Sequence, residues 1–265
     1  MTVLLQVSDP HFGAEREPAV EALVTLCREL APDLLVLSGD ITQRARAAQF
    51  EAAAAFVRRL QVPNVLAIPG NHDLPLFNVL GRGLDPYAGY KRAFGAQLEP
   101  SFSAPDCLVL GVKTTRRYRH VDGEISDAQR ERVAGALRRA SAQQLRIVVL
   151  HQPVAVPRPS EQKNVVHGHA SAVRAWAEAG ADLILAGHIH LPFVLPLHES
   201  RALARPLWAV NAGTAVSSRL RWDAGNSVNV IRTSEPALAG RCVVEHWTFG
   251  DARSKFERSA QLSVG

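Results

Sequence analysis

The chain has 265 residues, of which 47% are hydrophobic and 21% are charged. This length fits one large α/β domain or two small ones, and no apolar run is long enough for a membrane span. The net charge of +5 comes from arginines spread over predicted helices, so an anionic substrate is allowed but a nucleic-acid-binding surface is not indicated.

The cysteines and the first residues of the chain indicate the cellular compartment of the protein. Cys27, Cys107 and Cys242 are odd in number and lie in apolar contexts. This pattern predicts buried thiols in a reducing compartment. The opening "MTVLLQVSD" lacks the basic segment of a signal peptide and predicts a strand instead. We therefore expect a cytoplasmic protein.

The first part of the chain alternates between predicted strands and helices. Apolar runs at 2–8, 33–39 and 64–69 predict strands. Apolar residues at helical spacing predict helices over 18–30 and 46–60. This β-α-β-α-β order favours parallel strands joined by right-handed crossovers.

The rest of the chain follows a different pattern. Short helices with Gly and Pro breaks are predicted within 74–100. Further strands are predicted at 107–112, 146–150 and 182–187, with helices from 126 to about 142 and over 169–180. After residue 190 only strands are predicted, at about 192–197, 207–212, 227–233 and 241–249. We expect a single domain over 1–265, with β/α units to about residue 190 and a β-rich part over 191–250.

Polar side chains follow five of the predicted strands at the point where each strand ends. They are Asp9, His11, Asp40, Asn71, His72, Asp73, His151, His188 and His190. Each one alone is typical of a turn, a helix cap or a surface position. Because ligands bind at the carboxyl ends of strands in open α/β sheets, their shared position indicates one site.

These residue types indicate a metal site. Imidazole and carboxylate groups bind Zn, Fe, Mn and Co. The set contains no cysteine, so it is not a structural zinc site. The set is too large for one ion, and we therefore expect two metal ions with one carboxylate bridging them.

The order Asp-x-His, Gly-Asp, Gly-Asn-His-Asp, His and Gly-His-x-His, across residues 9–190, resembles the calcineurin-like metallophosphoesterase superfamily. The segments "GDITQRARAAQF", "PGNHD" and "NAGTAVSSRLR" further resemble the bacterial branch that includes class III cyclic-nucleotide phosphodiesterases. The resemblance implies an α/β fold with a central β-sandwich of mixed sheets flanked by helices. It also implies a dinuclear site at one edge.

The resemblance also implies a role for each site residue. By position, the first metal would be held by Asp9, His11, Asp40 and His190, and the second by Asp40, Asn71, His151 and His188. Asp40 would bridge two ions of Mn, Fe, Zn or Co. A bridging hydroxide would attack phosphorus, and His72 would protonate the leaving group as a general acid. Asp73 is expected to cap the following turn rather than to bind metal.

One departure from the Ser/Thr protein phosphatase branch is informative. In that branch a second Asp follows the Gly-Asp block three residues on and orients the catalytic histidine. Here that position is Gln43. This argues against a protein phosphatase and leaves the group that orients His72 open.

Three arginines are candidate substrate-binding residues, because guanidinium groups bind phosphate in a bidentate way. Arg219 and Arg221 lie in the polar segment 211–230, and Arg116 follows a predicted strand. Exposed arginines on a hairpin are an equally good account of the first two. The loop 152–168 is long enough to be a lid or a rim.

The preferred hypothesis is a phosphodiesterase with a small substrate, such as a cyclic nucleotide or a glycerophosphodiester. The alternatives are a phosphomonoesterase, a pyrophosphohydrolase of nucleotide-linked lipids, a nuclease and an inactive binding scaffold. No apolar cap insertion is evident in 74–100 to favour the lipid substrate, and the full ligand set argues against the scaffold. The expected partner is a small phosphoester. Nucleic acid is not expected, and an oligomer is allowed.

Overall fold

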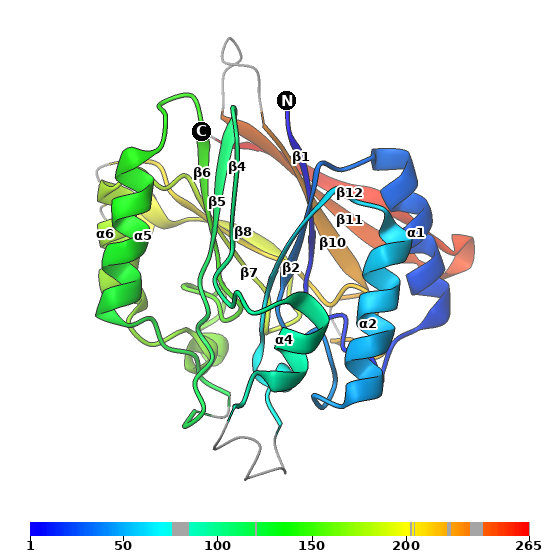
Figure 1. The fold of residues 1–265 in the computed structure, drawn as a ribbon. Coiled ribbons are helices and arrows are strands. Elements are labelled where there is room, and N and C mark those ends of the chain that lie inside the picture. Colours follow the sequence, from blue (N-terminus) through cyan, green and yellow to red (C-terminus); the bar gives the residue numbers. More distant parts are fainter. Residues whose placement is uncertain are drawn as a thin grey trace.

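The computed structural model describes residues 1–75, 85–119, 121–201, 203, 205–221, 224–233 and 241–264. Two six-stranded sheets pack face to face, and helices cover the outer face of each (Figure 1). This architecture confirms the predicted α/β fold with a central sandwich of mixed sheets. That the chain forms a single domain stays a prediction.

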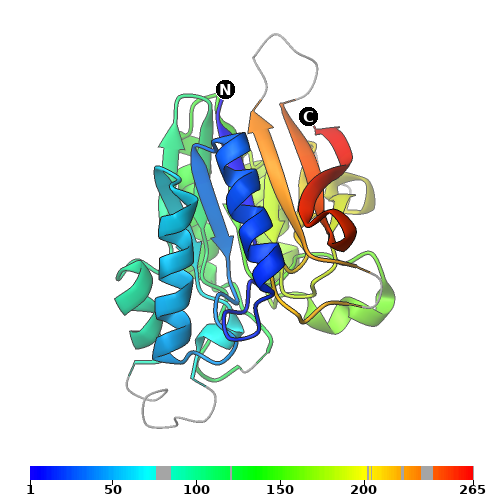
Figure 2. The ribbon, with the colours of Figure 1, turned by 90° about the vertical axis from the view of Figure 1, so that its right-hand side faces the viewer.

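The first sheet consists, in spatial order, of β12 (Lys255–Val264), β11 (Cys242–Gly250), β10 (Ser227–Thr233), β1 (Val3–Val7), β2 (Leu34–Ser38) and β3 (Asn64–Ile68). β1, β2 and β3 pair in parallel, as the alternation of strands and helices predicts. The connecting helices α1 (Glu17–Leu30) and α2 (Ala47–Leu60) lie side by side on the outer face of this sheet, as Figure 2 shows. The shorter helix α4 (Ala88–Phe94) contacts α2.

The second sheet consists, in spatial order, of β4 (Ser101–Ala104), β5 (Cys107–Gly111), β6 (Leu145–Val149), β7 (Leu183–Ala186), β9 (Trp208–Asn211) and β8 (Phe193–Pro196). Its four central strands are parallel, and its two edge strands are antiparallel to their neighbours. Helices α5 (Asp127–Arg139) and α6 (His169–Glu178) pack on its outer face. The remaining elements are α7 (Leu197–Arg201) and the 3-10 helices η1 (Asn71–Asp73), η2 (Pro159–Asn164) and η3 (Asp251–Arg253).

The structure differs from the sequence prediction mainly after residue 190. The predicted run of strands is interrupted by α7, and β12 extends the β-rich part beyond residue 250. Most residues of β12 are exposed at the edge of its sheet, so no apolar alternation indicates a strand there. Of the short helices predicted within 74–100, α4 is present, whereas residues 76–84 lie outside the described residues.

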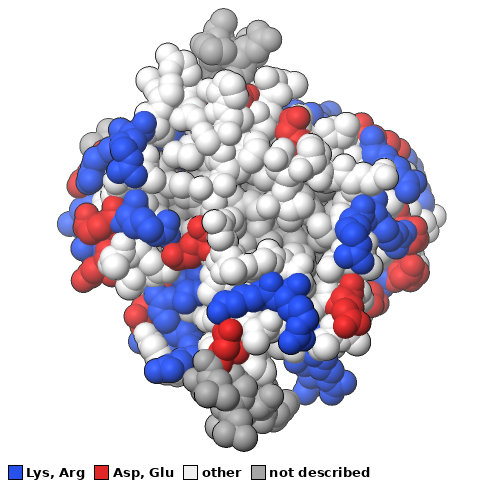
Figure 3. All heavy atoms as spheres, viewed as in Figure 1, with Lys and Arg blue, Asp and Glu red and all other residues white. Residues whose placement is uncertain are grey.

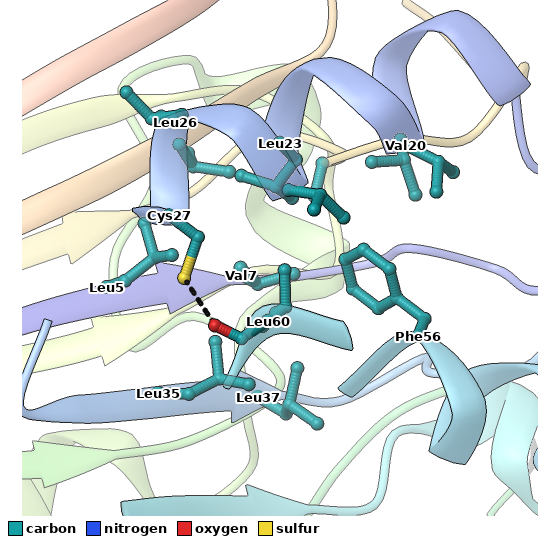
Figure 4. Close-up of a cluster of buried hydrophobic side chains, with 14 of the residues drawn as sticks. Leu5, Val7, Val20, Leu23, Leu26, Cys27, Leu35, Leu37, Phe56 and Leu60 are labelled. Carbon is teal, nitrogen blue, oxygen red and sulfur yellow. Dashed lines mark hydrogen bonds between the residues drawn. The ribbon is translucent and has the colours of Figure 1, made fainter. Parts of the chain in front are cut away.

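The core is divided into three apolar layers, one between the two sheets and one beneath the helices on each side. In the layer under α1, Leu23 and Cys27 pack towards Leu5 of β1 and Phe56 of α2 (Figure 4). The Cys27 thiol lies 3.5 Å from the main-chain oxygen of Leu60. Burial raises the pKa of this thiol to about 11. All three cysteines are buried and free, which confirms the predicted buried thiols.

The helices also bear on the prediction that no segment spans a membrane. The two longest in the described part of the chain, α1 and α2, have 14 residues each. Among the described residues, none of the helices is both long enough and apolar enough to cross a bilayer. The cytoplasmic location stays a prediction.

The packing of the core can be tested by replacing one buried leucine and one exposed leucine with alanine. Leu5 is fully buried on a central strand, whereas Leu220 is 41% exposed. We expect Leu5→Ala to lower the free energy of unfolding by about 2–5 kcal/mol, because it leaves a cavity in a packed layer. Leu220→Ala should change it by less than about 0.5 kcal/mol. Urea denaturation followed by circular dichroism measures both, and similar values for the two variants would contradict the packing described.

Candidate metal centre

The candidate site lies at one edge of the sandwich, where loops from both sheets meet. The loops after β1, β2 and β3 come from the first sheet, and those after β6 and β7 come from the second. Across this junction the backbone N–H of His188 donates to Asp9 Oδ2 at 2.9 Å. The junction brings together eight of the side chains singled out in the sequence, namely Asp9, His11, Asp40, Asn71, His72, His151, His188 and His190.

The backbone has an unusual conformation at this edge. Nine described non-glycine residues have a positive φ. Five of them are candidate ligands, namely Asp9, His11, Asp40, His188 and His190. Such conformations cost roughly 1–3 kcal/mol each and cluster at functional sites. The surrounding fold therefore holds these side chains in place at a cost in stability.

Two glycines allow the loops to approach one another. A Cβ atom on Gly70 would lie 2.1 Å from the backbone nitrogen of Asp40, and one on Gly187 would lie 1.8 Å from Ser8 Oγ. Gly70 has a φ of −94°. It is therefore required by the close approach of two backbones, not by a left-handed conformation.

Asp9, His11 and His190 form the first group of candidate ligands. Their ligand atoms all lie within 4.8 Å of one another. His190 Nε2 is 3.0 Å from His11 Nε2 and 3.3 Å from Asp9 Oδ1. The hydroxyl of Ser8 donates to Asp9 Oδ2 at 2.6 Å, which leaves Oδ1 for the group. This group could hold one metal ion.

Asp40, His151 and His188 form the second group. His151 Nε2 lies 3.2 Å from Asp40 Oδ1 and 3.1 Å from Asn71 Oδ1, so the amide oxygen of Asn71 joins this group. The other oxygen of Asp40 is 3.8 Å from His11 Nε2 in the first group. Asp40 therefore lies between the two groups, as a bridging carboxylate must.

Main-chain carbonyls fix the orientation of three histidines. Nδ1 lies 2.8–2.9 Å from the main-chain oxygen of Ser38 for His151, of Arg219 for His190 and of Gln43 for His72. Because a carbonyl can only accept, each Nδ1 carries the proton. In the neutral ring, Nε2 then keeps its lone pair and is directed into the site.

The converging atoms fit metal cations. Asp9 Oδ1 and one ring nitrogen of His188, Nδ1, are buried and have no hydrogen-bond partner in the described part of the chain. Burial lowers the pKa of His11 to about 3 and that of His188 to about 4, so both rings keep the lone pairs that ligands need. Burial also disfavours the charged form of His151, yet the neighbouring Asp40 raises its pKa to about 9. Facing acceptors in a buried site require positive charge between them, and this donor set suits borderline divalent metals.

His72 lies beside the two groups and is not one of their ligands. Its Nε2 is 4.0 Å from Asp40 Oδ2, and 29% of its side chain is exposed. The Gln43 carbonyl that accepts from Nδ1 answers the question left open by the sequence. The Gln43 side chain contacts Arg219 rather than His72, because its Oε1 accepts from Arg219 Nη1 at 3.3 Å. The same Nη1 lies 3.1 Å from His72 Nε2.

Asp73 connects two of the ligand-bearing loops. It was expected to cap the turn that follows it, but its carboxylate instead accepts from the backbone N–H of Gly70 at 2.9 Å. It also accepts from the backbone of Ile41 at 3.1 Å and from the backbone and hydroxyl of Thr42 at 2.8 and 2.9 Å. Asp73 is therefore a buried cross-link between the loop after β2 and the turn after β3.

A cavity of about 440 Å³ opens over the site. Its wall includes candidate ligands from both groups, together with His72, Arg219 and Arg221. Val121, Lys163 and Asn164 also line it, although no pattern in the sequence indicates them as site residues. The length of the loop 152–168 was the available signal for the last two, since they belong to η2 within that loop.

The three candidate substrate-binding arginines have different surroundings. Arg219 and Arg221 line the cavity, and Arg221 Nη1 donates to Glu161 Oε1 at 2.9 Å. Arg116 does not line it, because its guanidinium donates to Gln129 Oε1 at 2.6 Å and to the main-chain oxygen of Lys113 at 3.0 Å. The roles of all three arginines in substrate binding stay predictions.

Comparisons with known proteins give relatives by sequence. The model of the family described as calcineurin-like phosphoesterase matches residues 2–192. A protein of Synechococcus sp., named as a probable cyclic nucleotide phosphodiesterase, is 26% identical over 212 residues. The aligned region covers 72% of this chain and 74% of that relative.

Solved structures give relatives by fold. A purple acid phosphatase from yellow lupin (Lupinus luteus) matches with a TM-score of 0.75 and 11% identity over 99% of this chain and 53% of its own. The chain thus spans about half the length of the lupin protein. A dimetal phosphatase from Danio rerio matches with a TM-score of 0.70 and 14% identity over 99% of this chain and 98% of its own. At these identities the likeness shows the fold alone.

The cross-link made by Asp73 can be tested by substitution. Asp73→Ala would leave three buried N–H groups without their acceptor, and each can cost about 1–3 kcal/mol. We expect a lower free energy of unfolding and an affinity for Mn²⁺ reduced roughly 10- to 100-fold, measured by isothermal titration calorimetry.

Two further variants serve as controls for this experiment. Asp73→Asn keeps one carbonyl oxygen and should lie between the wild type and Asp73→Ala. Asp127→Ala, at a side chain that is 88% exposed, should leave the affinity for Mn²⁺ unchanged. An unchanged affinity in folded Asp73→Ala would show that the cross-link does not support the site.

Proposed function

Since the chain belongs to the calcineurin-like phosphoesterase family and is a metal-dependent phosphoester hydrolase, we propose that it is a phosphodiesterase that cleaves a small phosphodiester. The observation that carries this proposal is that two groups of His and Asp side chains converge. Asp40 belongs to the second group and also lies next to the first. The name of the Synechococcus relative supports a diester, and a cyclic nucleotide or a glycerophosphodiester is the proposed substrate class.

The proposed metal ligands follow the two groups. Asp9, His11 and His190 would hold one ion, and Asn71, His151 and His188 would hold the other, with Asp40 shared between them. When bound, the two ions would activate a water molecule as the nucleophile and offset negative charge on the phosphoryl oxygens. The position of Asp9 Oδ1 beside His190 and the pairing of His151 with two oxygens support this assignment.

His72 is the proposed proton donor. As the bond between phosphorus and the leaving oxygen breaks, His72 in its imidazolium form, with a proton on each ring nitrogen, would give the Nε2 proton to the departing alkoxide and return to the neutral ring. The Gln43 carbonyl holds Nδ1, so the ring presents Nε2 to the cavity. Arg219 lies 3.1 Å from that nitrogen, and we expect an anionic phosphoryl oxygen to attract its guanidinium away from the imidazole.

The charge distribution supports a small substrate rather than a nucleic acid. On the face shown in Figure 3, basic side chains lie in a row across the lower part, but acidic side chains lie among them. Within the cavity, the charge of Arg221 is paired with Glu161, whereas Lys163 and Arg219 have no carboxylate partner among the described residues. These two cations suit the phosphoryl group of a small molecule.

The proposal is tested by comparing bis(p-nitrophenyl) phosphate with p-nitrophenyl phosphate in the presence of Mn²⁺. We expect a higher kcat/KM for the diester, with loss of most of that activity in Asn71→Ala, because the second group loses its amide oxygen. Asn164→Ala, at another amide on the cavity wall, is the matched control and should retain metal-dependent turnover. A preference for the monoester would favour a phosphatase, and no turnover of either ester with metal bound would count against the proposal.

The role of His72 is tested with two diesters that differ in their leaving group. An alkoxide needs a proton as it departs, whereas p-nitrophenolate is stable without one. We therefore expect His72→Ala to lower kcat about 10²- to 10⁴-fold for an alkyl diester and far less for the p-nitrophenyl diester. Arg219→Ala should raise KM for both esters alike. Equal losses of kcat for both esters in His72→Ala would exclude it as the proton donor.

A further inference from the structure

A second cavity opens where β8, at the edge of one sheet, faces β11 and β12 of the other. Its volume is about 270 Å³, and it shares no lining residue with the cavity over the candidate site. Phe193 and Val194 of β8 form one side, and Ala260 and Leu262 of β12 form another. His246 of β11 adds a polar group to this apolar lining.

A series of hydrogen bonds fixes the polarity of the groups that lead to His246. It begins at the main-chain oxygen of Ala186, which can only accept, and Gln6 Nε2 donates to it at 2.9 Å. Gln6 Oε1 therefore faces the other way and accepts from Asn229 Nδ2 at 3.0 Å. Asn229 Nδ2 also donates to the main-chain oxygen of Asn211 at 3.3 Å. The amide oxygen of Asn229 is thus the group that faces His246.

The end of this series determines which nitrogen of His246 carries the proton. Nδ1 of His246 lies 3.0 Å from Asn229 Oδ1, and an amide oxygen cannot donate, so Nδ1 is the donor. Burial lowers the pKa of His246 to about 4, which keeps the ring neutral near pH 7. Nε2 then has a lone pair, and no donor within the described residues lies within hydrogen-bonding distance of it. The cavity therefore presents the acceptor of His246 in a lining that is apolar apart from the amide residues Asn229 and Gln261.

We propose that this cavity binds a small aromatic molecule with a single N–H or O–H donor, such as an indole or a phenol, and that the donor bonds to His246 Nε2. The apolar sides favour a ring, because burying aromatic surface is favourable. An anion or a ligand with only acceptors would face the lone pair of Nε2 and is disfavoured. A site of this kind discriminates against a ligand that lacks the matching donor, since the bound ligand then covers the acceptor and leaves it unpaired.

Indole and 1-methylindole separate the donor from the apolar contact, because methylation removes the N–H and keeps the ring. In titrations of the full chain by isothermal titration calorimetry, we expect indole to bind about tenfold more tightly than 1-methylindole. In protein with ¹⁵N-labelled histidine, indole should shift the Nε2 resonance of His246, and 1-methylindole should not.

Two variants complete the experiment. His246→Phe keeps a ring of similar size and removes the acceptor, so indole should then bind no more tightly than 1-methylindole. His167→Phe makes the same change at a side chain that is 50% exposed and should preserve the tenfold preference. Because His246→Phe leaves the Asn229 oxygen without its donor, the resonance shift in the wild-type chain decides the question if this variant does not fold. Equal affinities for the two probes, or no binding of either, would overturn the proposal.

Discussion

The close approach of the turn after β3 to the loop after β2 is the constraint on which the candidate site depends. Gly70 allows this approach because a side chain there would collide with the backbone of Asp40. Asp73 completes it by accepting N–H groups from both segments. The same contact sets the positions of Asp40, between the two groups, and of Asn71 and His72. The contact between these two segments therefore holds both candidate ligands and the proposed proton donor. A substitution that disrupts this contact would affect metal binding and proton transfer together.

The way in which the histidines are held has an electrostatic consequence. A main-chain carbonyl orients an imidazole as a carboxylate would, but it adds no negative charge to the site. Here carbonyls hold Nδ1 of His72, His151 and His190, and the candidate ligands include only two carboxylates, Asp9 and Asp40. With two divalent ions bound, the site would keep excess positive charge, which suits an anionic phosphoester.

The positions of the candidate ligands could be predicted from the sequence because each follows an apolar strand, and the ends of parallel strands meet at one edge. The group that orients His72 could not, because the Gln43 contact uses a main-chain oxygen that every residue has. Lys163 reaches the cavity only through the course of a long loop. Arg116 follows a strand as the candidate ligands do, yet Gln129 of α5 takes its guanidinium, a contact that depends on tertiary packing. Sequence position thus predicts which strand end a residue occupies, and packing decides what its side chain contacts.

The layer between the sheets changes from apolar to polar towards the candidate site. Leu4 and Val36 belong to the apolar core, and two residues further along the same strands Gln6 and Ser38 face the same layer. Buried amides and hydroxyls cost free energy unless they are paired, and Gln6 is paired on both sides. The Ser38 carbonyl in turn orients His151. The network that sets the polarity of the second cavity therefore lies against the strand that carries a candidate ligand loop. An apolar residue in place of Gln6 would deprive the Ala186 oxygen of one donor and the Asn229 amide of one acceptor, and would thus disturb both sites.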